Sequence, residues 1–198
     1  MSRHITLLAG SSRGNSQSLK VASYLRQRLA SLGLCDSTAL IDLGTSRLPL
    51  WPDKDANNTW SQLRTLLQEA TALIVISPEW NGMACPALKN LFLYAGLGEL
   101  GHKPALLVGV SAGLGGAYPL SELRAYSYKN CRIAYLPEQL VVRHVECMFN
   151  EGEPQDEQDA RLRARADWAL QMLCQYDQAL QNVRRDIDLF HPDFANGM

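Results

Sequence analysis

The sequence has little net charge of either sign, which limits the partners that it suits. Nineteen basic and twenty acidic side chains leave a net charge of -1 over 198 residues, with no long run of one sign. Nucleic acids and anionic membrane surfaces attract strongly basic patches, so neither is expected as a partner. A small-molecule partner fits this composition better.

Long apolar runs and targeting patterns are also missing. No apolar stretch approaches the roughly 20 residues that a helix needs to cross a bilayer. The amino terminus lacks the charged, apolar and small-residue order of a signal peptide. We therefore expect a cytoplasmic protein, and the length predicts a single domain over residues 1–198.

The cysteines and histidines give no sign of a disulfide framework or a metal site. The cysteines are odd in number and widely spaced, which is typical of reduced, mostly buried thiols: Cys35, Cys85, Cys131, Cys147 and Cys174. Apart from His144 and Cys147, the histidines and cysteines show no paired spacing, and one such pair does not make a metal site. No bound metal is expected.

What the sequence does contain is a regular alternation of apolar runs and helical periodicities. Five runs of strand length are expected at 4–10, 38–43, 72–78, 104–111 and 138–145, although Arg143 and His144 interrupt the last. Apolar stripes near a spacing of 3.6 predict helices over 19–29, 60–70, 88–95 and 156–187. This alternation predicts an α/β fold with a mostly parallel sheet. Ligands of such sheets bind beyond the carboxyl ends of the strands.

The loop after the first strand has the composition of an anion site. Gly10 permits a tight turn, and serine hydroxyls suit the start of the following helix, whose first N–H groups lack partners. Arg13 can pair with a phosphate through two hydrogen bonds, and Ser11, Ser16 and Ser18 supply hydroxyls. The alternative is an ordinary serine-capped helix beside an exposed arginine. The nucleotide-hydrolase and dinucleotide motifs are both absent.

The loop after the third strand suits a flat, aromatic ligand. Pro78, Asn81 and Gly82 favour turns, and Gly82 lets the backbone approach a ligand closely. Trp80 and Met83 add apolar surface next to backbone amides, a combination that binds planar heteroaromatic rings. The alternative is a structural turn with a packed tryptophan.

The loop after the fourth strand is rich in glycine and allows two interpretations. Four glycines within residues 109–116 provide close backbone approach and spare N–H groups. The same stretch matches the G-x-S-x-G spacing of a hydrolase nucleophile elbow, in which Ser111 would act with His191 and either Asp186 or Asp188. Pro119 interrupts the helix that should follow such a nucleophile, and this interpretation leaves the first two loops unexplained.

Together these loops resemble those of the NADPH-dependent FMN reductase family of flavodoxin-like proteins, which includes quinone, chromate and azo reductases. The resemblance covers residues 4–135. "GSSRGNSQS" (10–18) is close to the family's G-S-x-R-x-x-S loop, and "SPEWNGMACPALKN" (77–90) is close to its P-E-Y-N loop followed by L-K-N. Trp80 stands where the family usually has tyrosine, the glycine loop is shorter than usual, and no arginine directly follows Gly116.

The resemblance implies a five-stranded, doubly wound parallel sheet of order 2-1-3-4-5 in a three-layer α/β/α arrangement, with FMN at the point where strand order reverses. It also implies a homodimer or homotetramer. By matching positions, the FMN phosphate would be held by Ser11, Arg13, Ser16, Gln17 and Ser18. The isoalloxazine ring would be lined by Pro78, Glu79, Trp80, Asn81 and Gly82, and the pocket would be completed by Ser111, Gly113 and Gly116.

The implied activity is that of an FMN-dependent NAD(P)H oxidoreductase. NADPH or NADH would pass hydride to the bound flavin, and a small acceptor such as a quinone, free flavin or other xenobiotic would then take the electrons. The cofactor carries this chemistry, so the residues above are predicted to bind and none is predicted to be catalytic. The alternative within this fold is a flavodoxin-like electron carrier, whose docking would be helped by a stronger charge bias than this sequence has.

Overall fold

The computed structural model describes residues 2–194 and contains a parallel sheet of five strands. These strands are β1 (His4–Ala9), β2 (Ser37–Asp42), β3 (Ala72–Trp80), β5 (Pro104–Val110) and β6 (Ala134–Val142). They lie in the order β2-β1-β3-β5-β6, and the two-residue strand β4 (Met83–Ala84) pairs antiparallel with the end of β3. Counting the parallel strands alone, this is the predicted order 2-1-3-4-5. The sequence patterns did not predict β4.

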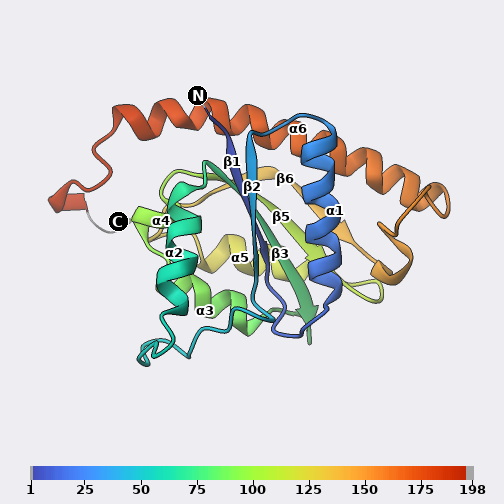
Figure 1. Ribbon diagram of the computed structural model, residues 1–198, viewed down its shortest axis with the longest axis horizontal. Helices are drawn as coiled ribbons and strands as arrows, with labels where there is room; N and C mark the ends of the chain where they lie inside the picture. The colour runs from blue at the N-terminus through green and yellow to red at the C-terminus, as the bar shows by residue number, and fades with distance from the viewer. Residues whose placement is uncertain (1, 195–198) are drawn as a thin grey trace.

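Helices cover both faces of the sheet and confirm the three-layer arrangement (Figure 1). One face is packed by α1 (Gln17–Ser31) and the long α6 (Glu157–Asp186). The other face is packed by α2 (Thr59–Glu69), α3 (Pro86–Tyr94), α4 (Leu97–Leu100) and α5 (Tyr118–Tyr126). Two short 3-10 helices, η1 (Val145–Cys147) and η2 (Pro192–Phe194), follow β6 and α6. Across residues 2–194, none of the helices combines the length and apolar character of a membrane-crossing segment.

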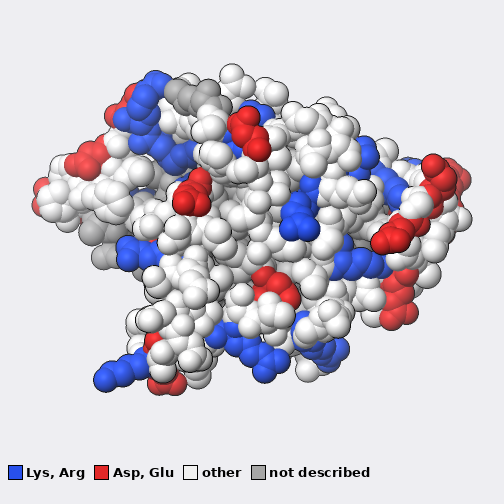
Figure 2. Space-filling model, in the orientation of Figure 1, with Lys and Arg blue, Asp and Glu red and all other residues white. Residues whose placement is uncertain are grey.

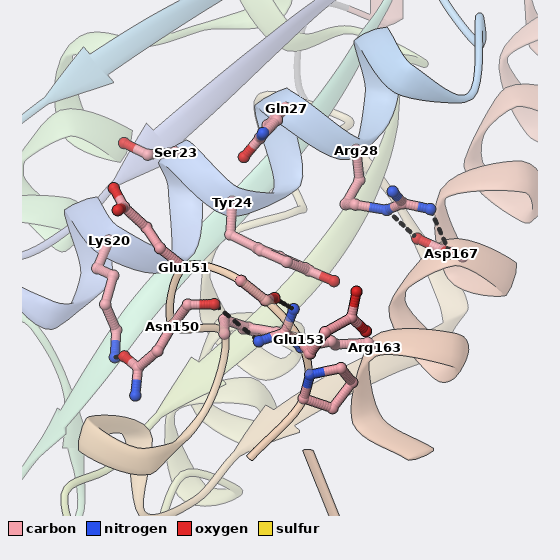
Figure 3. Close-up of a pocket in the computed structure, with 13 residues that line it drawn as sticks. Lys20, Ser23, Tyr24, Gln27, Arg28, Asn150, Glu151, Glu153, Arg163 and Asp167 are labelled. Atoms are coloured by element: carbon pink, nitrogen blue, oxygen red, sulfur yellow. Dashed lines mark hydrogen bonds and ion pairs between the residues drawn. The ribbon is translucent and has the colours of Figure 1, made fainter. Parts of the chain in front are cut away.

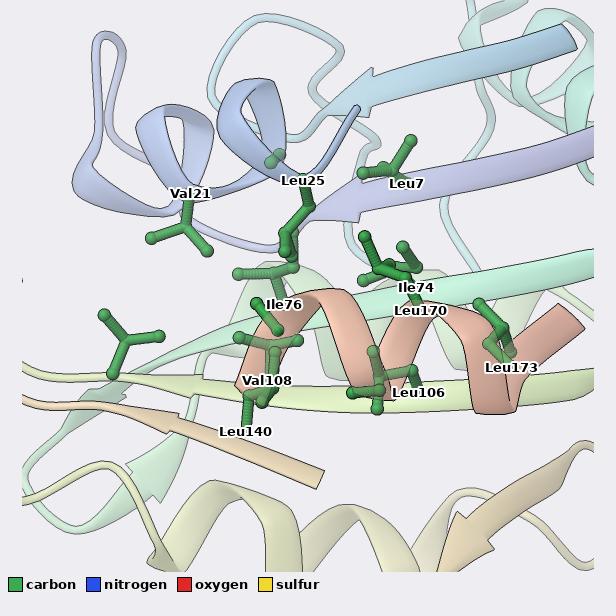
Figure 4. Packing of buried hydrophobic residues seen from close by; sticks show 14 of the residues in the cluster. Leu7, Val21, Leu25, Ile74, Ile76, Leu106, Val108, Leu140, Leu170 and Leu173 are labelled. Atoms are coloured by element: carbon green, nitrogen blue, oxygen red, sulfur yellow. The ribbon is translucent and has the colours of Figure 1, made fainter. Parts of the chain in front are cut away.

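The strands are apolar throughout because both of their faces are buried. In β1, Leu7 faces the core under α1 and α6, whereas Leu8 faces the core under α2 and α3. Figure 4 shows the first of these cores, in which Val21 and Leu25 of α1 and Leu170 of α6 meet the sheet. This double burial explains why the strand runs lack alternation.

The predicted boundaries of β6 were wrong at both ends. The strand begins at Ala134 rather than at residue 138, and its register against β5 shifts between Ala105 and Leu107. Pro137 lies at this irregularity, where an edge strand tolerates the missing N–H. The strand ends at Val142, and His144 adopts a left-handed backbone conformation with φ of 46°.

A helix follows the glycine loop, but it does not begin directly after Ser111, as a nucleophile elbow requires. Helix α5 begins at Tyr118, so the proline lies in its first turn. A proline is well tolerated there because the N–H groups of the first turn have no partner within the helix. The helix therefore starts only after the glycine loop has ended.

The five cysteines are free thiols, as predicted, but not all are buried. Cys85, Cys131 and Cys174 lie in the core, and burial raises the pKa of Cys174 to about 11. Cys35 is half-buried and Cys147 is exposed. The expectation of buried thiols is therefore wrong for Cys147.

Lys103, which precedes β5, is hydrogen-bonded to α2, and its burial should make the free energy of unfolding depend on pH. Its Nζ donates to the carbonyls of Leu67 and Gln68 at 2.7 and 2.9 Å, and burial lowers its pKa from 10.5 to about 8. Because the folded pKa lies below the unfolded one, burying the ammonium costs stability below pH 8, and this cost is relieved as the pH rises toward 10.5.

We therefore compare the wild type with Lys103→Met, which lacks the titrating group. The difference between their free energies of unfolding should move in favour of the wild type by about 2 kcal/mol between pH 7 and pH 10. Urea unfolding at both pH values measures this shift. A difference that stays constant with pH would contradict the assignment of a charged, buried Lys103.

Candidate functional site

The three loops singled out in the sequence meet at one edge of the sheet. They follow β1, β3 and β5, which are neighbours in the sheet, so their carboxyl ends lie side by side. β2 pairs with one side of β1, and β3 pairs with the other side. The strand order therefore reverses at β1, and the carboxyl end of β1 is the switch point at which ligands of such sheets bind. The Gly10 N–H donates to the Ile76 carbonyl at 2.8 Å and joins the first loop to β3.

Gly10 is required by this close approach. A Cβ at this position would lie 2.6 Å from the Ile76 carbonyl oxygen, closer than real Cβ atoms come. Beyond Gly10, the Ser11 side chain is buried, and its hydroxyl accepts a hydrogen bond from the Arg13 N–H at 3.2 Å. The first loop is therefore held tightly against the sheet at its start.

Helix α1 begins at the end of this loop with the features of an anion site. Ser16 is its N-cap, and the Ser16 hydroxyl accepts from the Leu19 N–H at 3.1 Å. The first turn contains no acidic residue, and Gln17, its first residue, is exposed. Ser18 is 1% exposed, yet its hydroxyl has no hydrogen-bond partner among the described residues. Buried hydroxyls are normally paired, so this one is consistent with a ligand in the loop.

The second loop approaches the first through an aromatic contact. Trp80 lies at the end of β3, and the Arg13 guanidinium sits over its ring at 4.9 Å from the centroid. Asn81 and Gly82 turn the chain with φ values of 50° and 73°. Pro78 is buried within β3. The predicted phosphate-binding and ring-binding residues thus touch in this structure.

The third loop is tied to the second by the Glu79 carboxylate. Its Oε2 accepts from the N–H groups of Gly116 at 2.6 Å and Tyr118 at 3.3 Å. Ser111 holds the start of the loop, because its hydroxyl accepts from the Gly113 N–H at 3.1 Å. The loop thus rests on β3 and β5. The Glu79 side chain thus holds the glycine loop in place, a contact that the sequence did not predict.

The glycines of the third loop serve different purposes. Gly116 has a φ of 102°, and its carbonyl oxygen would lie 1.8 Å from a Cβ at Gly109, so the loop packs directly on the β5 backbone. A Cβ at Gly113 would meet nothing within 4 Å, so Gly113 borders open space. The predicted pocket residues therefore include one glycine that closes the loop and one that leaves room.

The serine-hydrolase interpretation is wrong because its residues lie at opposite ends of the sheet. Ser111 follows the carboxyl end of β5, whereas Asp186 ends α6 and Asp188 follows it. The end of α6 lies near the amino ends of the strands, where Arg184 donates to the His102 carbonyl at 2.9 Å. The seven residues of β5 separate these ends by about 20 Å. His191 stacks on Phe194, and its Nδ1 accepts from the Asp193 N–H. These residues therefore cannot form a catalytic triad.

A residue that the sequence analysis did not single out supports the site from α3. Asn90 is buried, and its side chain accepts from the Trp51 N–H at 2.9 Å and donates to the Pro49 carbonyl at 2.8 Å. It thereby fixes the loop that follows β2. A cavity of about 270 Å³ lies between this loop and the first one, lined by Ser12, Leu43, Ser46, Arg47, Leu48, Ala87 and Asn90. The signal for Asn90 was its place in the L-K-N sequence.

A larger pocket of about 720 Å³ lies between α1, α6 and residues 149–154 (Figure 3). Its cationic groups already have partners. Arg28 and Asp167 form two hydrogen bonds of 2.8 Å, and the Lys20 ammonium donates to the Val145 carbonyl at 2.6 Å. Arg163 bonds the carbonyls of residues 150 and 152. The Arg28–Asp167 pair joins α1 to α6, and the other contacts join the two helices to residues 145–152, so we assign the pocket a structural role.

Comparisons with known proteins agree with the fold. A model of the NADPH-dependent FMN reductase family matches residues 3–146. An NADPH azoreductase from Bacillus sp. (strain OY1-2) is 26% identical over 142 residues, which cover 70% of this chain and 75% of that protein.

Solved structures show the same architecture. The flavoenzyme NAD(P)H:(acceptor) oxidoreductase FerB from Paracoccus denitrificans superposes with a TM-score of 0.68 at 21% identity, over 90% of this chain and 98% of that one. An NAD(P)H:quinone oxidoreductase from Methanothermobacter marburgensis gives a TM-score of 0.61 at 14% identity, over 87% and 100% of the two chains. At these identities the likeness shows the fold.

The sheet order, the covering helices and the loops at one edge define a flavodoxin-like α/β protein. Since the family model spans well over half of the sequence, the chain belongs to the NADPH-dependent FMN reductase family. It is therefore an oxidoreductase that uses FMN and NAD(P)H, and the resemblance found in the sequence is confirmed.

Proposed function

We propose that the chain holds FMN across the three loops and reduces a small acceptor, such as a quinone, a free flavin or another xenobiotic, with NAD(P)H. The names of the relatives support this acceptor class, since they include azoreductase and quinone oxidoreductase activities. The single observation that carries the proposal is the convergence of the Ser18, Trp80 and Gly113 loops at the point of strand-order reversal. FMN bound there would accept hydride from NAD(P)H and pass electrons to the acceptor.

The first loop would bind the FMN phosphate. The unpaired Ser18 hydroxyl and the N–H groups at the start of α1 are available donors, and a phosphate dianion suits the positive end of a helix. Arg13 would leave the Trp80 face and pair with the phosphate. Ser11, Ser16 and Gln17 complete this group, with Ser11 and Ser16 also fixing the loop through the hydrogen bonds described above.

The second and third loops would hold the isoalloxazine ring. Trp80 offers an aromatic face, and the turn at Asn81 and Gly82, following Pro78, leaves backbone amides exposed beside it. Glu79 would act as a positioning residue, because it keeps the backbone of Gly116 in place. Ser111 and Gly113 would border the ring on the other side. None of these groups needs to exchange a proton with the substrate.

Mixing with NADPH tests this function against the electron-carrier alternative. The FMN-loaded protein should lose its flavin absorbance near 450 nm within seconds of anaerobic mixing with NAD(P)H, and a quinone should restore it. An electron carrier would stay oxidised under the same conditions, and that outcome would contradict the proposed reaction.

We also propose that the working form is a homodimer or homotetramer. Large side chains are exposed on neighbouring helices: Leu93 of α3 is 58% exposed, and Tyr118 and Tyr126 of α5 are 70% and 82% exposed. Leu93 and Tyr126 line a hollow of about 530 Å³ between α3 and α5, which the Lys89–Glu122 ion pair of 2.8 Å bridges. The patch reaches Tyr118, whose N–H bonds Glu79, so a second copy would cover the flavin site as well.

Leu93→Glu should therefore shift the protein toward the monomer, because a carboxylate would be buried at the contact. Light scattering during size-exclusion chromatography measures the mass directly. Leu50→Glu, which changes a leucine 71% exposed in the loop after β2, is the matched control. A wild type that is monomeric at every concentration would contradict this assembly.

We also propose that the protein is cytoplasmic and that its residues form a single domain. Five free thiols favour a reducing compartment such as the cytoplasm. The continuous sheet and its two cores favour one FMN-binding domain over residues 1–198, of which the structure describes 2–194.

A further inference from the structure

A basic pocket lies between the end of β6 and the first turns of α6. Its volume is about 570 Å³, and it is lined by Val141, Arg143, Gln158, Arg161, Leu162 and Arg165. We call this the arginine pocket. None of these residues belongs to the three loops assigned to FMN.

The arginine pocket carries an excess of positive charge. Arg165 pairs with Glu138 and also lies over the Trp168 ring at 5.1 Å. Arg143 donates to a backbone carbonyl, and Arg161 is exposed. Within residues 2–194, no carboxylate lies within ion-pair distance of Arg143 or Arg161. The Arg161 guanidinium and the terminal N–H groups of Arg143 therefore have no carboxylate partner among the described residues and can bind an anion.

The pocket combines these charges with an apolar floor. Positions 158, 161 and 165 share one face of α6, because residues three and four apart lie above one another on a helix. Val141 and Leu162 contribute apolar surface beside them. Arginine binds a phosphate through two parallel hydrogen bonds, and an apolar floor suits a heterocyclic base. The combination fits a phosphorylated nucleoside.

The arginine pocket shares a wall with the glycine loop. The Arg143 Nε donates to the Gly115 carbonyl at 3.2 Å. The Val141 side chain packs against Gly116, since a Cβ at Gly116 would be 3.0 Å from the Val141 Cγ1 atom. A molecule with one end at the isoalloxazine ring could thus place its other end over Arg143 and Arg161.

We propose that the arginine pocket binds the 2′-phosphate of NADPH and so discriminates NADPH from NADH. This inference rests on the proposed function, because it places the nicotinamide of the same molecule at the flavin. The ligand chemistry is a phosphomonoester dianion, which the 5′-phosphate of a free FMN acceptor also supplies. The test separates these two sources.

Nucleotide binding without turnover is the first measurement. Adenosine 2′,5′-bisphosphate and 5′-AMP are titrated calorimetrically into the full-length, FMN-loaded protein. The bisphosphate should bind more tightly, and Arg161→Gln should weaken its binding about tenfold or more without changing 5′-AMP binding, as for loss of one charge-assisted contact. Arg26→Gln, at an exposed arginine on α1, is the matched control and should change neither. Equal binding of the two nucleotides, or no effect of Arg161→Gln, would overturn the proposal.

Steady-state kinetics with a neutral quinone then separates the two phosphate sources. Arg161→Gln should raise the KM for NADPH about tenfold or more and leave the KM for NADH and both kcat values within about twofold. If the variant instead raises only the KM for free FMN as acceptor, the pocket holds the acceptor phosphate and the proposal is overturned. The calorimetric titration needs no reaction, so it tests the arginine pocket independently of turnover. If the proposed function itself is wrong, NAD(P)H will not reduce the FMN-loaded protein.

Discussion

Gly109→Ala is expected to lower the free energy of unfolding by about 3 kcal/mol and to abolish stoichiometric FMN binding. The added Cβ would lie 1.8 Å from the Gly116 carbonyl oxygen, and since the backbone fixes the position of both atoms, no side-chain rotation can relieve the clash. The loop must lift from β5, which breaks the 2.6 Å hydrogen bond between the Gly116 N–H and Glu79. Urea unfolding and FMN titration measure the two effects.

Gly113→Ala is the matched control for this prediction. It adds the same methyl group in the same loop, where nothing lies within 4 Å of the new atom, so stability should change by less than about 0.5 kcal/mol. FMN affinity should nevertheless fall, because the methyl group occupies the space proposed for the ring. Equal losses of stability in the two variants would show that the contact between Gly109 and Gly116 does not hold the loop.

Arg13→Ala is expected to weaken FMN binding by about 1.5 to 3 kcal/mol, or roughly 10- to 100-fold. Arg13 supplies the positive charge of the first loop, and its guanidinium lies over the Trp80 ring. Loss of a charge-assisted contact to phosphate has this magnitude. Quenching of tryptophan fluorescence on FMN addition provides the affinity. Stability should stay within about 0.5 kcal/mol of the wild type, since Arg13 is exposed.

Two further variants define what Arg13 contributes. Arg13→Lys keeps the charge but loses the two parallel hydrogen bonds, so its affinity should fall between those of the wild type and Arg13→Ala. Arg26→Ala removes an exposed arginine from the middle of α1 and should leave affinity unchanged. An Arg13→Ala protein that binds FMN as tightly as the wild type would remove this residue from the phosphate site.

The fold was predictable because both faces of the sheet are buried. Uninterrupted apolar runs separated by helical periodicity specify parallel strands, and the carboxyl ends of parallel strands share one edge. The sequence pattern alone therefore predicts that the loops after β1, β3 and β5 lie together, and the structure confirms that arrangement. The start of β6 was missed because Pro137 breaks the apolar pattern without ending the strand.

The contacts within the site were less predictable because they depend on tertiary structure. No local pattern indicates that Glu79 turns toward the glycine loop or that Arg13 covers Trp80. Likewise, the number of residues between Ser111 and His191 does not reveal that they lie at opposite ends of β5. The sequence therefore matched a hydrolase motif that the fold does not allow. Short elements such as β4 have too few residues to show any periodicity.

Titration of the purified protein with FMN, followed by its absorbance spectrum, tests the central claim most directly. We predict one FMN bound per chain, a yellow protein with a perturbed flavin band near 450 nm, and bleaching of that band by NADPH. A protein that stays colourless and takes up no added FMN would contradict the account of the three loops as a flavin site.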